Sequence, residues 1–198
     1  MTEQDYVARA LAGDEDAFTP LVETYQTAIY NLCYRMLGDG PEAEDAAQET
    51  FLRAYAQLRR YDRARSFKTW LFSIASHHCI DRLRKRRLTW LSIEDEDLAP
   101  HPNLREAAPG PEASALRREH SAAIQKYLAR LAPEDRNMIV LRYWYDLSYE
   151  EIAEASGATV SAVKSRLHRA RGAMAEMMHA PGPAPARQPA LAVEGMNR

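Results

Sequence analysis

The stretch LSYEEIAEASGATVSAVKSRLHRAR, residues 147–171, carries the clearest structural pattern in this 198-residue chain. Ser148 and Glu151 make the capping-box pattern that begins a helix, and Gly157 can take the left-handed backbone that ends one. Thr159 stands where it can cap a second helix. A short helix, a glycine-containing turn and a second helix are typical of a helix-turn-helix. Apolar residues recur in the second helix at intervals of three and four and form one stripe: Val160, Val163, Leu167, Ala170 and Met174.

The opposite face of this second helix is polar and basic. No acidic residue occurs between Gly157 and Gly172, whereas a merely soluble helix usually mixes charges of both signs. An ordinary helical hairpin with a solvated cationic face is the alternative, but the missing acidic residues favour a phosphate-lined DNA groove. The candidate DNA-contacting residues are Thr159, Ser161, Lys164, Ser165, Arg166, His168, Arg169 and Arg171.

Charge is unevenly distributed along the chain, although its formal net charge is only -2. Residues 1–60 hold eleven acidic and five basic residues, whereas residues 61–90 hold eight basic and two acidic ones. This segregation predicts contact with a polyanion at chosen places. The two cysteines form no CxxC motif, the acidic amino terminus shows no signal-peptide pattern, and no apolar run could span a bilayer. We therefore expect a soluble cytoplasmic protein.

Helical periodicity dominates the first half of the chain, which shows no strand alternation. It predicts helices over residues 2–11, 14–37 and 41–58. Pro20 falls in the first turn of the second helix, where proline is tolerated, and Pro41 begins the third helix. The third helix has an apolar inner stripe, and its outer polar residues form either a solvated face or a docking surface.

A fourth helix, SFKTWLFSIASHHCIDRLRKRR, is capped by Ser66 and ends in a dense basic block at residues 84–87. Cations near a helix carboxyl end are favoured by the macrodipole, but four in succession exceed that need. Aromatic residues ahead of such a block suit single-stranded nucleic acid, because bases stack on rings and cations follow phosphates. At least one of the three aromatics is expected to be ordinary core: Phe67, Trp70 or Phe72.

Composition changes after this helix and divides the chain. The predicted fold is all-α, with two small helical domains, 1–91 and 113–179, joined by a flexible, acidic, proline-rich linker at 92–112. The linker is either a tether or a mimic of nucleic acid inside a cationic channel. The tail at 180–198 is rich in proline and alanine, and we expect it to be disordered.

Four motifs in this order resemble the extracytoplasmic-function (ECF) sigma factors of bacterial RNA polymerase. DEDAFTPLVETY resembles the start of sigma region 2, and DAAQETFLRAY resembles the helix that docks on polymerase. The fourth helix is similar to the family's promoter-melting and −10-reading helix, although Ser76-His77 stands where Arg-Asn is common. Residues 131–171 resemble region 4 almost throughout, and the whole resemblance covers about residues 5–175.

The resemblance implies a function without covalent chemistry. The second helix of the helix-turn-helix would read the −35 promoter element, and the linker would thread toward the RNA exit path. Binding and melting of the −10 element would fall to Lys68, Trp70, Ser76, His77, Asp81, Arg82, Arg84 and Lys85. Docking on the clamp helices of the largest polymerase subunit would fall to Asp45, Gln48, Glu49, Leu52 and Arg53.

The partners implied by the resemblance are core RNA polymerase, through its clamp helices and flap, promoter DNA and an anti-sigma factor. The free protein would be a monomer without membrane insertion, associated with the nucleoid, and would serve a stress- or signal-responsive set of genes. We expect no cofactor. We also expect no metal site at His77-His78-Cys79, because adjacent helical residues point about 100° apart.

Two alternatives from other classes remain at this point. A helix-turn-helix transcriptional activator that is not a polymerase subunit would share the 147–171 pattern, but it needs a ligand pocket or a phospho-acceptor domain that the first half does not indicate. An enzyme would need a nucleophile–base pair or metal-ligand spacing, and the sequence shows neither pattern.

Overall fold

The computed structural model describes residues 1–92 and 111–179, with side chains at 1–88 and 121–179. All regular structure within these ranges is helical, which confirms the all-α prediction. The first domain contains the α-helices α1 (Glu3–Leu11), α2 (Thr19–Leu37), α3 (Gly40–Gln57) and α4 (Phe67–Ser92), with short 3₁₀ turns at Glu15–Phe18 and Leu58–Arg60. The second contains α5 (Pro111–Arg130), α6 (Pro133–Trp144), α7 (Tyr149–Ser156) and α8 (Val160–His179).

Local capping explains where most of these helices begin and end. Thr2 forms a complete capping box with Asp5 at the start of α1, and Asp39 accepts from the backbone N–H of Glu42 at 2.9 Å at the start of α3. Gly38 ends α2 in the left-handed region, with φ of 80°. The expected start of the second helix is wrong by several residues, because residues 15–18 form a separate 3₁₀ turn before α2.

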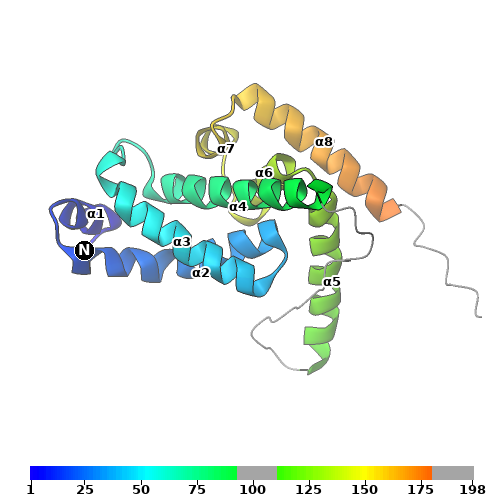
Figure 1. The fold of residues 1–198 in the computed structure, drawn as a ribbon, viewed down its shortest axis with the longest axis horizontal. Coiled ribbons are helices and arrows are strands. Elements are labelled where there is room, and N and C mark those ends of the chain that lie inside the picture. The colour runs from blue at the N-terminus through cyan, green and yellow to red at the C-terminus, as the bar shows by residue number, and fades with distance from the viewer. Residues whose placement is uncertain (93–110, 180–198) are drawn as a thin grey trace, which may run out of the picture.

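The core of the first domain lies where α2, α3 and α4 face one another (Figure 1). Small side chains of α3, including Ala43, Ala46 and Ala54, are fully buried and allow close approach of the other two helices. Larger side chains from α2 and α4 fill the space between them. These are Ile29, Leu32, Met36, Phe67, Leu71 and Phe72.

The second domain packs directly onto the first. Helix α4 contacts α7 and α6, helix α2 contacts α5 and α6, and the buried apolar residues of both domains form one continuous cluster. In Figure 1, α4 crosses the molecule with α7 and α8 on one side and α2 and α3 on the other. The docked helices therefore bring the helix-turn-helix beside the fourth helix.

Side chains of the second domain cap the carboxyl end of α2. The last carbonyl groups of a helix lack partners within it. Gln125 donates to the carbonyl oxygen of Arg35 at 3.1 Å, and the guanidinium of Arg136 donates to the carbonyl oxygen of Met36. Arg136 is 6% exposed and also donates to the carbonyl of Ala129. Burial lowers the pKa of Arg136 to about 10, and the positive charge of nearby Arg86 adds to this shift. This interface is therefore specific as well as apolar.

The expected boundaries of the linker are only partly described. Ser92 belongs to α4, and residues 111 and 112 already belong to α5. The remainder of the 92–112 linker and the 180–198 tail lie outside the described residues. Among the described helices, none combines the length and the apolar character that crossing a bilayer requires.

Candidate nucleic-acid interface

Helices α7 and α8 form the predicted helix-turn-helix. Ser148 accepts from the N–H of Glu151 at 3.1 Å, and the Glu151 carboxylate accepts from the N–H of Ser148 at 2.8 Å. These backbone and side-chain bonds to Ser148 hold the pKa of the Glu151 carboxyl below its usual range. Gly157 turns the chain with φ of 65°, and Thr159 accepts from the N–H of Ala162 at 3.2 Å. The capping predictions for both helices are confirmed.

Helix α8 separates an inner apolar face from an outer polar face. Val163, Leu167 and Ala170 are buried, whereas Val160 and Met174 pack at the edge of the core. Most of the predicted DNA-contacting side chains are exposed on the remaining surface. They are Thr159, Ser161, Lys164, Ser165, His168, Arg169 and Arg171, with Arg166 half-buried beside them.

Two arginines of this surface share one carboxylate from α6. Asp135 accepts a hydrogen bond from Arg166 at 3.1 Å and lies 3.6 Å from a guanidinium nitrogen of Arg169. The side chain of Asp135 is only 17% exposed, compared with 65% for Arg169. Arg169 therefore extends toward solvent while one of its nitrogens faces a carboxylate fixed in the domain.

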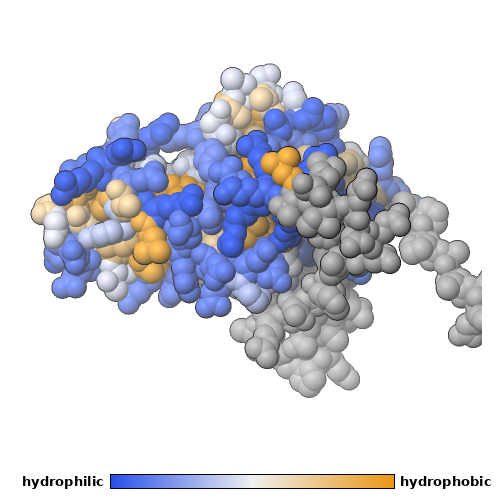
Figure 2. All heavy atoms as spheres, in the orientation of Figure 1, coloured by the Kyte–Doolittle hydropathy of each residue, from blue (hydrophilic) through white to orange (hydrophobic). Residues whose placement is uncertain are grey.

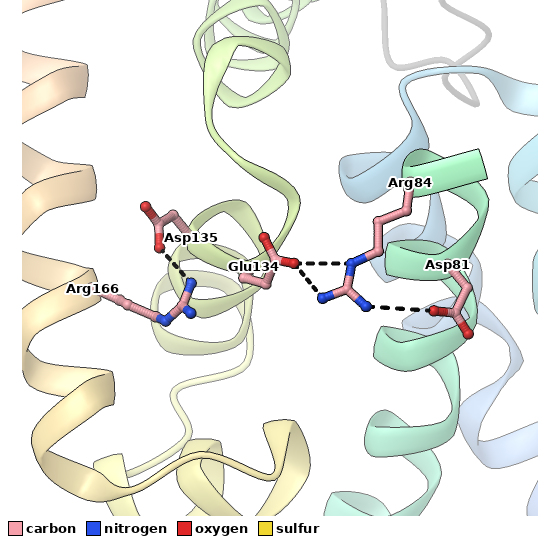
Figure 3. A network of polar contacts seen from close by, with 5 residues as sticks. All are labelled: Asp81, Arg84, Glu134, Asp135 and Arg166. Carbon is pink, nitrogen blue, oxygen red and sulfur yellow. Dashed lines mark hydrogen bonds and ion pairs between the residues drawn. The ribbon is translucent and has the colours of Figure 1, made fainter. Parts of the chain in front are cut away.

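The neighbouring Glu134 points the opposite way, toward α4. Figure 3 shows Glu134 meeting Arg84, while Asp135 meets Arg166. Arg84 donates to one oxygen of Glu134 from two nitrogens, at 2.6 and 3.1 Å. Partial burial raises the pKa of Glu134, but its hydrogen bonds to the backbone and to Arg84 outweigh this, and the pKa lies below its usual value. Each of two adjacent carboxylates thus holds an arginine from a different candidate DNA-binding helix.

The predicted −10 residues on α4 differ in accessibility. His77, Asp81, Arg84 and Lys85 are exposed, and the Nδ1 of His77 lies 2.8 Å from the carbonyl of Ser73. Two further residues of the set are only partly exposed. Lys68 donates to the Tyr145 carbonyl at 3.4 Å, and Arg82 donates to the Glu42 carbonyl at 3.2 Å.

Ser76, which was also predicted to be a −10 residue, is buried in the docked arrangement of the two domains. Its exposed fraction is 0%, and its hydroxyl has no hydrogen-bond partner among the described residues. Burial therefore prevents its hydroxyl from contacting DNA in this structure.

The three aromatic residues of α4 have separate roles. Phe67 and Phe72 are buried, which confirms that the group includes ordinary core residues. Trp70 is partly exposed, with its ring centroid 5.0 Å from that of Tyr61 and 5.5 Å from that of Phe67. An aromatic platform of Trp70 and Tyr61 consequently reaches the surface at the amino-terminal end of α4.

The predicted polymerase-docking residues lie together on α3. Asp45, Gln48 and Arg53 are exposed, and Leu52 is 67% exposed. Figure 2 shows an apolar patch over the region in which Figure 1 draws α3, within a largely hydrophilic face. Glu49 pairs with Arg53 at 2.6 Å, and this hydrogen bond lowers the pKa of the Glu49 carboxyl. The surface therefore combines an apolar side chain with charged neighbours.

Sequence reasoning did not identify the residues that organise these surfaces. Glu134 and Asp135 follow Pro133 and have the pattern of an ordinary acidic helix start, so nothing indicated their arginine partners. Arg65 also pairs across the two domains, with Glu154 of α7 at 2.7 Å. Among the described residues, no group of three or more His, Cys, Asp or Glu side chains is arranged to hold a metal ion.

Two protein families match the chain. The family Sigma-70 region 2 matches residues 21–89, and the family Sigma-70, region 4 matches residues 121–174. The ECF RNA polymerase sigma factor SigW of Bacillus subtilis is 41% identical over 170 residues, which cover 84% of this chain and 91% of SigW. The RNA polymerase sigma-H factor of Pseudomonas aeruginosa is 34% identical over 176 residues, covering 87% of this chain and 91% of that protein.

Solved structures with similar folds extend over nearly the same residues. CnrH in complex with the cytosolic domain of CnrY has a TM-score of 0.66 at 25% identity, covering 89% of this chain and 96% of CnrH. The sigma factor RpoE of Bartonella quintana, in complex with the anti-sigma factor NepR, has a TM-score of 0.61 at 24% identity. That similarity covers 81% of this chain and 96% of RpoE.

Proposed function

This chain belongs to the ECF sigma factors of RNA polymerase, and we propose that it directs core polymerase to promoters by reading the −35 element with α8 and melting the −10 element with α4. The activator alternative is not supported, because both family matches and the curated relatives are sigma factors.

The observation that carries the −35 proposal is the exposed basic face of α8, which has no acidic residue between Gly157 and Gly172. A helix of a helix-turn-helix enters the major groove with its amino-terminal part near the bases. Thr159 and Ser161 begin α8, so they would lie at base edges or phosphates, and Lys164 and Arg169 follow on the same exposed surface.

The −10 proposal rests on the aromatic and basic surface of α4. Trp70 and His77 offer rings to unpaired bases, and Arg82, Arg84 and Lys85 would follow the phosphates of the separated strand. The partly exposed platform of Trp70 and Tyr61 is the observation in favour of base stacking, because both residues reach the surface. Lys68 would join this surface once its bond to Tyr145 is released.

Polymerase docking is assigned to the exposed surface of α3. Leu52 would supply the apolar contact, and Asp45, Gln48 and the Glu49–Arg53 pair would surround it with polar interactions. This arrangement has the apolar centre and charged rim of a protein–protein interface. We assign its partner as the clamp helices of the largest polymerase subunit. The flap remains a proposed second contact, and association with the nucleoid would follow from promoter binding.

The docked arrangement of the domains has a consequence for promoter binding. The two promoter elements lie about 25 base pairs apart, or roughly 85 Å along B-DNA at 3.4 Å per base pair. Helix α7 of the −35-reading unit contacts α4 of the −10-reading unit directly. The domains must therefore move apart before one molecule can engage both elements.

A protein inhibitor is the remaining proposed partner. The sigma factor RpoE of Bartonella quintana was solved in complex with the anti-sigma factor NepR. We assign to this chain a partner of the same general kind, an anti-sigma factor that competes with polymerase.

Run-off transcription of genomic fragments with core polymerase tests the proposal. Transcripts should start at defined sites only when this protein is added, and Arg169→Ala should reduce them while the protein still binds core polymerase. Equal transcription with and without the protein would reject the sigma-factor assignment for this chain.

A further inference from the structure

We infer that Asp135, which lies outside the recognition helix, sets the −35 base preference by positioning Arg169, with Arg166 anchoring the carboxylate. This inference rests on the proposed −35 function of α8. It assigns to Asp135 a positioning role, because the carboxylate itself would not contact DNA.

The geometry distinguishes the two arginines that meet Asp135. Arg166 makes the shorter contact, a hydrogen bond at 3.1 Å, and its side chain is 35% exposed. Arg169 lies 3.6 Å from the same oxygen and is 65% exposed. Arg166 is therefore suited to hold Asp135 in place, and Arg169 is suited to extend into the groove.

Asp135 is itself held firmly by the domain. It lies in the first turn of α6, and its side chain is 17% exposed. The next residue, Arg136, is buried and donates to the backbone carbonyl groups of Ala129 and Leu131, which belong to the same domain and are kept when the domains separate. The carboxylate consequently has a fixed position relative to α8.

A fixed carboxylate changes what an exposed arginine can do. A free arginine side chain samples many rotamers and loses that freedom when it binds, whereas an oriented guanidinium loses less and presents its donors in one plane. Reading a guanine requires two such donors aimed at O6 and N7. Asp135 would occupy one nitrogen of Arg169 and leave the outer donors directed toward the base edge.

The adjacent Glu134 provides a matched control. It has the same charge, occupies the same helix turn and also contacts an arginine, but it points to Arg84 on α4 and away from α8 (Figure 3). Glu134→Gln and Asp135→Asn therefore remove equal charge from the start of α6. Any effect of lost negative charge on general DNA affinity should be similar in both variants.

The experiment is selection of −35 sequences from a randomised promoter library by full-length protein in complex with core polymerase. The wild-type protein should enrich one −35 sequence. Asp135→Asn should reduce enrichment at one base pair by about tenfold, as expected when a guanine-reading arginine loses its geometry. Glu134→Gln should leave the base preference unchanged. Asp135→Glu keeps the charge, so it should retain part of the preference that Asp135→Asn loses.

A double variant connects the effect to Arg169. If Asp135 acts through Arg169, Asp135→Asn should add nothing to the preference already lost in Arg169→Ala. A thermal melt checks that Asp135→Asn is folded. If it is not, Asp135→Ala, which also removes the carboxylate, replaces it.

An unchanged base preference in folded Asp135→Asn, or an equal change in Glu134→Gln, would overturn the positioning role. A wild-type protein that enriches no −35 sequence would reject the proposed function itself, so the two failures are distinguishable.

Discussion

Tyr145 donates its hydroxyl proton to the carbonyl oxygen of Ala28 at 2.6 Å, across the interface of the two domains. Burial raises the pKa of this tyrosine, so the hydroxyl remains a donor at neutral pH. The ring also packs edge-to-face on Phe72 of α4, with centroids 4.6 Å apart. Tyr145 therefore joins the second domain to both α2 and α4, the helices that must be released before promoter binding.

Tyr145→Phe should favour separation of the domains while keeping the ring contact. Loss of one buried hydrogen bond costs about 1 kcal/mol, which is roughly a fivefold change in the equilibrium between docked and separated domains. The measurement is energy transfer between dyes attached after Gln26→Cys on α2 and Glu176→Cys on α8, since both positions are exposed and the native cysteines are buried.

Tyr143→Phe is the matched control, because Tyr143 lies in the last turn of α6, two residues before Tyr145, and is 56% exposed. Energy transfer should fall in Tyr145→Phe and stay at the wild-type value in Tyr143→Phe. Equal transfer in both variants would show that this hydroxyl does not hold the domains together.

Local sequence signals predicted the helix-turn-helix closely because its ends are determined by neighbours in the chain. Ser148, Glu151 and Gly157 act within a few residues of one another, and all three perform the predicted roles. The burial of Ser76 was not predicted, because a polar residue at one position of a helix with a weak apolar stripe can face either way. The tertiary fold buries it.

Long-range pairs could not be predicted for a different reason. Arg136 and Met36 are 100 residues apart, and a buried arginine bonded only to carbonyl groups leaves no complementary charge in the sequence. The pairing of Asp135 with arginines of α8 could not be predicted either, since an acidic residue after Pro133 is sufficiently explained by the helix macrodipole. The family resemblance gave the roles of whole helices but not these pairings.

Reversing charge on α3 should weaken binding to core polymerase. The variant Asp45→Lys with Glu49→Lys places two cations around exposed Leu52 where the proposed interface has two carboxylates. We expect the dissociation constant for core polymerase to rise by at least about tenfold, because a like-charge or mismatched interface is costly. Folding should be intact, since Asp45 is exposed and the Glu49–Arg53 pair is a surface ion pair.

Fluorescence anisotropy of labelled protein titrated with core polymerase measures this affinity. A control with Glu15→Lys and Glu23→Lys makes the same charge change on exposed residues outside α3. Comparable weakening in both double variants would point to net charge and not to the α3 surface.

Trp70→Ala should slow promoter opening more than promoter binding. Its ring packs on Tyr61 and Phe67 but remains partly exposed, so truncation should cost less stability than the ~3–5 kcal/mol of a fully buried tryptophan. Fluorescence of a probe base in the −10 element reports opening, and filter binding reports the initial complex. A melting temperature lowered as much as in a variant of buried Phe72 would make Trp70 a core residue instead of a stacking platform.

Lys164 and Arg169 should affect −35 binding in different ways. Both are exposed on α8, but the ammonium of Lys164 lies over the Tyr149 ring at 5.8 Å, whereas Arg169 faces Asp135. Removal of a lysine that contacts only phosphate should weaken binding to all promoters about equally and reduce the salt dependence by about one released counterion. Removal of a guanine-reading arginine should weaken the binding free energy by about 1–3 kcal/mol for sequences that carry its base pair, and should relax specificity at that position.

The test is binding of the polymerase complexes of Lys164→Ala and Arg169→Ala to a panel of −35 variants at two salt concentrations. Lys164→Ala should preserve the rank order of the sequences and flatten the salt slope. Arg169→Ala should change the rank order at one position, because a lost guanine contact affects only sequences that carry that guanine. A uniform loss of affinity for every −35 sequence in Arg169→Ala would mean that this arginine contacts the DNA backbone, and base reading would then have to come from other residues at the amino-terminal end of α8.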